Sequence, residues 1–240
     1  MRDYKIETEK RVAFIKEKMA EAHAHGLIFG NSGGKDSALV GILCSMATDN
    51  VLAVAMPCHS KRNYGEDMDD AVALAEAFGI EMITVDLTET RSELTEAIGE
   101  ELSKAALSNI APRLRMTTLY ALGQTKNYLV VGTGNKSERY MGYFTKWGDG
   151  AFDLNPIADL TATEIFEFLR YLKAPLNIIE KAPSAGLYEG QTDEQEMGVT
   201  YKAIDEYITT GETDPKSKEI IDRYHRVSEH KRKLPTVYGE

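Results

Sequence analysis

The chain has 240 residues, of which 42% are hydrophobic and 28% are charged, and its formal net charge is −10. This composition is typical of a globular protein and excludes fibrous and disordered classes. The acidic balance argues against a general nucleic-acid surface, and no apolar run approaches the roughly 18 residues of a membrane span. We therefore expect no nucleic-acid partner and no membrane association.

The start of the chain and the cysteines indicate the compartment. Residues 1–7 read MRDYKIE and contain no apolar signal segment. Cys44 and Cys58 are too few for a disulfide framework and lack metal-ligand spacing. We expect a cytoplasmic protein in which Cys44 lies in the core and Cys58 is a loop thiol.

Apolar periodicity predicts helices and strands in alternation along the chain. Short apolar runs predict buried strands over 27–29, 51–56, 82–85 and 128–131. Between and before them, helical spacing predicts helices over 11–24, 37–46, 67–78, 92–107 and 113–126, and helix and loop beyond Gly150. This order indicates an α/β fold, with a Rossmann-like parallel sheet, helices on both faces and a helical C-terminal part.

The loop after the first predicted strand is rich in glycine and hydroxyl side chains. It reads GNSGGKDS over residues 30–37 and leads directly into a helix. Glycines let the backbone approach a ligand, and a helix N-terminus aims N–H groups at the same point, so we interpret the loop as a phosphate cradle. The alternative is a tight turn in which Asp36 or Ser37 caps the helix.

Two common nucleotide motifs are excluded at this loop. The P-loop has glycine at the position of Phe29 and serine or threonine at the position of Asp36, and the dinucleotide fingerprint needs another glycine spacing. A carboxylate in a phosphate cradle is repulsive unless a cation lies between them. Mg²⁺ accepts carboxylate and phosphate ligands together, so Asp36 indicates a Mg²⁺ site.

The segment SGGKDS at 32–37, placed after a first strand, resembles the pyrophosphate loop of the N-type ATP pyrophosphatases. The resemblance implies an adenine nucleotide alpha hydrolase-like sheet and the splitting of ATP into AMP and pyrophosphate to adenylate a substrate. Further blocks resemble the NAD synthetase family in order and spacing, over about residues 10–235. They are RLR at 113–115, VGTGNKSE at 131–138, GYFTKWGDG at 142–150, DLNPI at 153–157, PSAGL at 183–187, QTDE at 191–194 and EHKR at 229–232.

The resemblance implies a reaction and a set of site residues. ATP adenylates the nicotinate carboxylate of deamido-NAD, and ammonia then displaces AMP to form NAD, with Mg²⁺ as cofactor. Positioning and electrostatic stabilisation are expected to supply most of the rate. The implied ATP contacts are Gly30, Asn31, Ser32, Gly33, Gly34, Lys35, Asp36, Ser37, Thr133 and Ser184; the Mg²⁺ ligands are Asp36 and Glu138; the deamido-NAD contacts are Arg113, Lys146, Asp153, His230 and Lys231; and the catalytic candidates are Asp149, which orients or deprotonates ammonia, and Lys146.

Several of these residues have simpler local interpretations. Asn135 and Glu138 have the spacing of a capping box. Arg113 and Arg115 read as a solvated helix face, and Lys146 beside Trp147 as a surface cation–π pair. His230 and Lys231 read as an exposed C-terminal helix. His23 and His25 stand two apart on an expected helix and point apart, so neither is a metal ligand.

Ala162 departs from the family pattern, because a lysine that reaches the ATP phosphates is usual at this position. Thr161 and Glu164 keep a capping-box spacing, so the helix start is expected to survive. Our hypothesis is that Lys35 supplies part of the missing positive charge. It is tested by Lys35→Ala, and unchanged ATP KM and pyrophosphate release would refute it. Asn31 stands where an apolar residue is usual and is expected to affect packing more than chemistry.

The resemblance also implies an organisation. We expect one synthetase domain over residues 1–240 with no glutaminase domain, and hence free ammonia as the nitrogen donor. A homodimer is expected by resemblance. Residues 182–196 are rich in Gly, Ser, Gln and acidic residues and are predicted to form a lid that orders over the intermediate.

Two other functions compete with this one. A different adenylating enzyme of the superfamily, such as a tRNA-thiolating enzyme, is disfavoured by two isolated cysteines and the negative charge. A non-catalytic nucleotide sensor is supported by Ala162 alone. The presence of Asp36, Glu138, Lys146 and Asp153 favours an active enzyme, because a sensor has no need of a metal pair.

Overall fold

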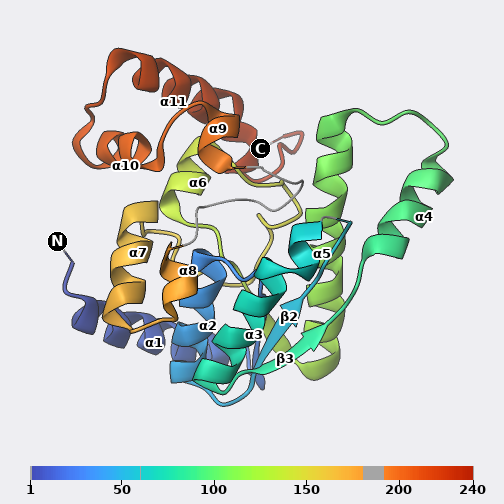
Figure 1. The fold of residues 1–240 in the computed structure, drawn as a ribbon, viewed down its shortest axis with the longest axis vertical. Coiled ribbons are helices and arrows are strands. Elements are labelled where there is room, and N and C mark those ends of the chain that lie inside the picture. Colours follow the sequence, from blue (N-terminus) through green and yellow to red (C-terminus); the bar gives the residue numbers. More distant parts are fainter. Residues whose placement is uncertain (1, 60, 181–191, 240) are drawn as a thin grey trace.

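In the computed structural model, which describes residues 2–59, 61–180 and 192–239, four parallel strands form one sheet in the order β3-β2-β1-β4 (Figure 1). The central strand β1 pairs with both β2 and β4. The expected α/β fold with a parallel sheet is thus confirmed, and each predicted strand is found within one or two residues of its expected bounds. The strands are β1 (Gly26–Gly30), β2 (Val51–Ala55), β3 (Glu81–Thr84) and β4 (Tyr128–Val131).

Helices cover both faces of the sheet because successive residues of the central strands β1 and β2 are apolar and point to opposite faces. Leu27 and Phe29 of β1 belong to one core cluster, which includes Leu39 of α2, whereas Ile28 belongs to a second cluster together with Ala111 of α5. The first face carries α1 (Tyr4–Glu21), α2 (Lys35–Ala47), α3 (Glu66–Phe78), α7 (Ala162–Tyr171) and α8 (Leu176–Glu180), and the second carries α5 (Lys104–Lys126).

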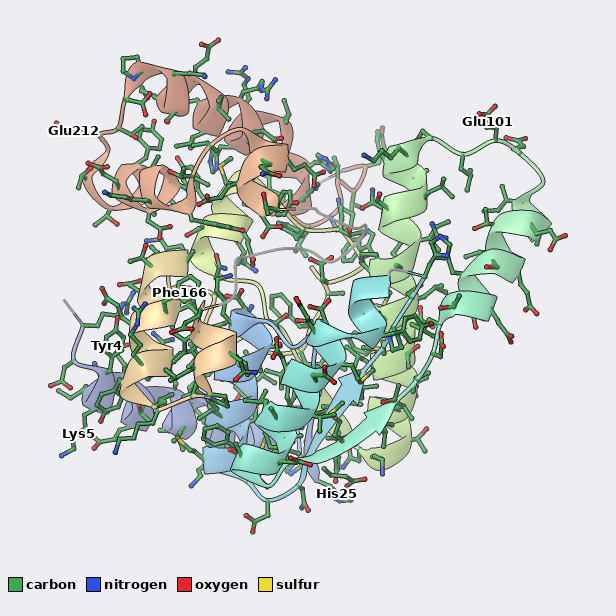
Figure 2. All side chains as sticks on the ribbon, viewed as in Figure 1. Tyr4, Lys5, His25, Glu101, Phe166 and Glu212 are labelled. Atoms are coloured by element: carbon green, nitrogen blue, oxygen red, sulfur yellow. The ribbon has the colours of Figure 1, made fainter. Side chains whose placement is uncertain are left out.

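The helices between β3 and β4 differ from the prediction. A single helix over 92–107 is wrong: α4 spans Thr88–Ile98, and Gly99 ends it in the left-handed region. Helix α5 then begins at Lys104, capped by the Ser103 side chain, and continues through the buried Pro112, where the prediction placed a boundary. A proline removes one backbone donor, but a long and well-packed helix tolerates this loss. Figure 2 labels Glu101 on the loop that connects α4 to α5.

The first helix also differs from its predicted bounds. It begins at Tyr4 rather than Arg11, because the Asp3 side chain accepts hydrogen bonds from the Lys5 and Ile6 amides. It ends at Glu21, so His23 and His25 lie outside it, and His23 has a positive φ of 50°. The first two turns of α1 are mostly polar, so the sequence shows no apolar periodicity there that would predict a helix.

Arg11 attaches α1 to the segment before α7. The residue is 8% exposed, and its guanidinium donates to both carboxylate oxygens of Asp159, at 2.6 and 3.0 Å, and to the carbonyl oxygen of Pro156. It also pairs with Glu7 one turn earlier in the helix, at 2.6 Å. A buried guanidinium with this many acceptors holds two distant parts of the chain together.

Replacing Arg11 with alanine is expected to lower the free energy of unfolding by about 2–3 kcal/mol. The loss removes the buried partner of Glu7 and Asp159. It is moderated because Arg2 Nη1 still lies 3.3 Å from Glu7 and 3.1 Å from Asp159, and because Asp159 is half exposed. Urea denaturation measures the change. Lys18→Ala, which removes the exposed pair with Glu21, is the control and is expected to leave the midpoint unchanged.

A helical layer stands beyond the carboxyl ends of the strands (Figure 1). Its own apolar cluster joins residues of α6, α7 and the last helices, among them Met141, Ala162 and Ile204. The buried Asp205 carboxylate fastens the layer to α7, since it accepts from the amide and hydroxyl of Thr163 at 2.8 and 2.6 Å and from Ser137. The layer contains α6 (Lys136–Met141), α9 (Asp193–Met197), α10 (Tyr201–Thr210), α11 (Pro215–Val227) and the 3₁₀ turn Glu229–Lys231.

The strand order defines where a ligand binds. From β1 the chain passes to β2 on one side, while β4 lies on the other side of β1, so the direction of winding changes between β1 and β4. In open parallel sheets the crevice at the carboxyl ends of such strands is the ligand site. Among the described residues, no helix combines the length and the apolar content that a membrane crossing requires.

Candidate active site

A cavity of about 800 Å³ opens at the carboxyl ends of β1 and β4. The glycine loop, α5 and the segment after α6 all contribute to its wall. The sequence-predicted residues Ser32, Gly34, Lys35, Asp36, Ser37, Thr133, Glu138, Asp149 and Lys231 line it, together with Gly30 and Asn31. Ser184 and residues 182–191 of the predicted lid lie outside the described residues. Residues 193–196 belong to α9 rather than to a loop.

The glycine loop has the backbone of an anion cradle. Gly33 has φ 69°, and a Cβ there would stand 2.1 Å from the Asp67 carbonyl oxygen, so only glycine fits. Gly34 is the N-cap of α2 and has no side-chain cap, while the Ser37 hydroxyl donates to the Gly34 carbonyl. The capping alternative for Asp36 and Ser37 is therefore wrong. The start of α2 presents N–H groups that no side chain caps.

Asn31 holds the loop against α3. It is 3% exposed, its amide donates to the Ala71 carbonyl at 2.9 Å, and its oxygen accepts from the Gly33 amide at 3.3 Å. This agrees with the packing effect expected from the polar substitution, because the side chain positions the glycines.

Asp36 is bound by two neighbours. Lys35 Nζ lies 2.5 Å from Asp36 Oδ2, and the Asn135 amide donates to Asp36 Oδ1 at 3.0 Å. Asn135 is also the N-cap of α6, and its capping box with Glu138 is complete. The capping prediction is thus confirmed. Because Asn135 also donates to Asp36, the start of α6 lies beside the start of α2, where the direction of winding changes between β1 and β4.

The electrostatics of this cluster are dominated by buried carboxylates. Burial raises the pKa of Glu138 well above its usual range, and the negative charge of Asp36 raises it further. Burial lowers the pKa of Lys35, but the charges of Asp36 and Glu138 outweigh burial and raise it above the ordinary value. Lys35 is therefore a charged ammonium in a negative site.

Ala162 is a core residue of the helical layer. It is 1% exposed and packs in the cluster with Met141, Met197 and Tyr201. Its helix begins with the complete capping box of Thr161 and Glu164 that the sequence predicts. The proposed compensation by Lys35 stays a prediction, with the addition that the ammonium contacts Asp36.

Four of the residues assigned to deamido-NAD come together. Arg113 donates to the Lys146 carbonyl at 3.3 Å, and Lys146 Nζ donates to the His230 carbonyl at 2.9 Å. Lys231 Nζ donates to the carbonyls of Gly142 and Phe144 at 2.8 and 2.7 Å. The alternative for Lys146 is also present, since its Nζ lies 5.4 Å from the centre of the Trp147 ring.

Asp153 stands apart from these four. Its carboxylate accepts from the Val130 amide at 2.7 Å and from the Tyr120 hydroxyl at 3.2 Å, so it joins β4 to α5. It nevertheless remains exposed. The structure thus gives Asp153 a structural contact and leaves its expected role toward deamido-NAD a prediction.

Asp149 lines the cavity and is exposed to its open space. Its Oδ1 accepts from the Thr145 amide at 2.9 Å. Desolvation by the cavity wall raises the pKa of Asp149, against the opposing effects of the Thr145 hydrogen bond and the positive charge of Lys231. A raised pKa makes the carboxylate a better proton acceptor than an ordinary aspartate.

Arg115 is a cavity residue that the sequence treated as solvated. Its Nε donates to the Met56 carbonyl at 3.0 Å, and Nη2 donates to the Asn63 side chain at 3.3 Å. Arg113 and Arg115 are two apart on a helix and point to different sides, so they were not one solvated face. This spacing was the available signal that one of them points inward.

The parallel sheet and its glycine loop define a nucleotide-binding protein with the adenine nucleotide alpha hydrolase-like fold. The chain belongs to the NAD synthase family, whose model matches residues 7–237. This confirms the resemblance read from the sequence blocks.

Individual relatives match over nearly the whole chain. An NH₃-dependent NAD⁺ synthetase from Carboxydothermus hydrogenoformans is 50% identical over 240 residues, 98% of each chain. Among solved structures, an NMN synthetase from Francisella tularensis is 38% identical with a TM-score of 0.96 and full coverage of both chains. An NH₃-dependent NAD synthetase from Campylobacter jejuni is 32% identical with a TM-score of 0.81, over 99% of both chains.

Proposed function

We propose that this protein is an ammonia-dependent NAD synthetase, which performs the last step of NAD biosynthesis. ATP adenylates the nicotinate carboxylate of deamido-NAD and releases pyrophosphate, and ammonia then displaces AMP to form the amide. The observation that carries the proposal is the shared cavity, in which the phosphate loop and Asp149 both face the same space. A carboxylate is a poor electrophile, so a site that activates it with ATP must also admit the nucleophile.

The ATP side of the cavity is the loop at 30–37 with Thr133. The uncapped amides at the start of α2 suit the phosphates, and Ser32 and Ser37 add hydroxyl donors beside them. These groups hold the pyrophosphate that leaves, and they stabilise its developing charge.

The residues fit Mg²⁺ as a cofactor shared with ATP. Among the described residues, no three His, Cys, Asp or Glu side chains are grouped to hold a metal by themselves. Mg²⁺ takes one or two carboxylates plus substrate phosphates, and Asp36 and Glu138 supply two carboxylates at the loop. When bound, the ion neutralises charge on the phosphates and activates ATP toward the carboxylate.

We assign deamido-NAD to the group formed by Arg113, Lys146, His230 and Lys231, of which Lys231 lines the cavity. Three of the four carry cationic side chains, which suits a dinucleotide with phosphates and a free carboxylate. Their hydrogen bonds join α5, the loop after α6 and the C-terminal 3₁₀ turn, so one ligand can contact three parts of the chain.

One assay tests the proposal. Purified protein is incubated with ATP, Mg²⁺, deamido-NAD and ammonium at about pH 8.5, where more of the ammonium is free ammonia. NAD, AMP and pyrophosphate are expected in equal amounts. The proposal is wrong if no NAD forms. Glutamine in place of ammonium is the matched control for the nitrogen donor.

A second candidate differs in the acceptor. The NMN synthetase from Francisella tularensis matches this fold with a TM-score of 0.96, against 0.81 for the Campylobacter jejuni NAD synthetase. The same amidation on nicotinate mononucleotide needs only one nucleotide half. Measuring kcat/KM for the mononucleotide and the dinucleotide under identical conditions decides between them, and a higher value for the mononucleotide would favour the second candidate.

A homodimer in the cytoplasm completes the proposal. Helix α4 has no buried residue, and its Leu94 and Ile98 are 40% and 43% exposed (Figure 1). A second copy covering α4 and the adjoining part of α5 accounts for these apolar side chains. Light scattering of the purified protein gives the mass that tests it. Both cysteines are free and buried thiols, which suits a reducing compartment.

A further inference from the structure

Lys35 is placed among carboxylates rather than toward open solvent. Its side chain is 5% exposed, it lines the cavity, and its ammonium forms the 2.5 Å pair with Asp36. Buried charge is stable only where it is paired, so the ammonium and the carboxylates neutralise each other. The negative charges of Glu138 and Asp193 also act on this ammonium and help to raise its pKa.

Two aromatic rings complete the surroundings of this ammonium. Lys35 Nζ is 5.4 Å from the centre of the Tyr201 ring and 5.8 Å from that of Phe166, and the Tyr201 hydroxyl donates to Asp193 at 3.0 Å. Figure 2 shows Phe166 on α7, which contacts α2. Ring faces attract a cation without binding it through a fixed hydrogen bond. The fixed partner of Lys35 is therefore the carboxylate that the proposed function assigns to Mg²⁺.

We propose that Lys35 is an internal counter-ion that competes with free Mg²⁺ for Asp36 and Glu138, and that it releases these carboxylates when ATP phosphates offer it another partner. The inference rests on the proposed function, since it takes Asp36 and Glu138 as the metal ligands. Its consequence is that free metal binds weakly and metal with ATP binds strongly. A lysine is suited to this exchange because its ammonium is a mobile point charge on a flexible stem.

A purely structural role for Lys35 predicts something different. If the side chain only fastens α2 to α7 and α10, its removal weakens the binding of both ligands, metal and ATP, or of neither. The competing role predicts opposite effects on two ligands, because the charge opposes free metal and favours ATP.

The test uses Mn²⁺ as the probe, measured by the electron paramagnetic resonance signal of unbound Mn²⁺, without nucleotide. Lys35→Gln is expected to bind Mn²⁺ at least about tenfold more tightly than the unmodified protein, because a unit charge beside the site is removed. The same variant is expected to bind ATP with Mg²⁺ about five- to tenfold more weakly in equilibrium dialysis without deamido-NAD.

Further variants locate the effect. Lys35→Met, of similar length, is expected to behave as Lys35→Gln, and it serves as the second variant if the first does not fold. Lys18→Gln removes an exposed lysine and is expected to change the affinity for neither Mn²⁺ nor ATP. Adding Asp36→Asn to Lys35→Gln is expected to abolish the tighter Mn²⁺ binding.

The inference is overturned if neutral Lys35 variants bind Mn²⁺ no more tightly than the unmodified protein. It is equally overturned if the tighter binding persists after Asp36→Asn, since the metal is then elsewhere. Neither measurement requires NAD formation, so a failure of the proposed reaction is recognised separately, in the activity assay.

Discussion

Asp36→Asn is expected to lower the rate of NAD formation at least about 10³-fold, because the metal–phosphate interaction is worth several kcal/mol in the transition state. Asparagine keeps the size of the side chain and can still contact Asn135, but it removes the charge that pairs with a cation. Both adenylation and the overall reaction are expected to fall together, since pyrophosphate release precedes amidation.

The measurement is the steady-state rate of NAD formation, with pyrophosphate release followed in parallel. Asp49→Asn is a matched control: it makes the same change in the loop before β2, at the opposite end of the sheet. Thermal unfolding within a few degrees of the unmodified protein shows that the fold is kept. If Asp36→Asn keeps a tenth or more of the original rate, Asp36 is not a ligand of the metal.

Asp149→Asn is expected to lower amide formation about 10²- to 10³-fold while adenylation continues. The attack of ammonia on the adenylated carboxylate leaves an extra proton on nitrogen, and Asp149 is the cavity carboxylate placed to accept it. The asparagine side-chain oxygen can still accept from the Thr145 amide, so the loop geometry is preserved. The change is therefore confined to the proton acceptor.

Two assays separate the half-reactions of this variant. Exchange of labelled pyrophosphate into ATP, without ammonia, reports adenylation, and NAD formation with ammonia reports the whole reaction. Equal losses in both assays would assign Asp149 to binding or folding rather than to proton transfer.

The pH dependence gives an independent check on Asp149. Desolvation by the cavity wall raises the pKa of this carboxyl, so it stays protonated to a higher pH than an ordinary aspartate. The base form is therefore lost as the pH falls through the raised pKa, and the rate of the unmodified protein, expressed per free ammonia, is expected to fall with it. Asp149→Asn is expected to lack this acid limb.

Much of the site was predictable because it is contiguous in the chain. The glycine loop is eight successive residues, and its conformation follows from Gly33 and from the helix that begins beside it. The capping box at Asn135 is likewise local. The parallel sheet followed from alternating strands and helices, whose apolar periods are visible over short windows.

Other features were wrong or missed because they depend on packing. Pro112 is a boundary signal by itself, yet it is buried and stands inside α5. Arg113 and Arg115 look alike in the sequence, and only the contacts of Arg115 with Met56 and Asn63 show that its side chain points inward. The start of α1 is set by the Asp3 cap, in a polar stretch that lacks the apolar periodicity of a helix.

The sequence by itself determined the fold class, the family and the loop that suits phosphates, since each rests on residue types and spacings within short windows or on blocks in a fixed order. Only the tertiary structure decided the partners of the charged groups. Whether Lys35 meets phosphate, Asp36 or the Tyr201 ring depends on helices that are distant in sequence and adjacent in space. Electrostatic energy depends on distance and burial, and neither quantity is contained in a local pattern.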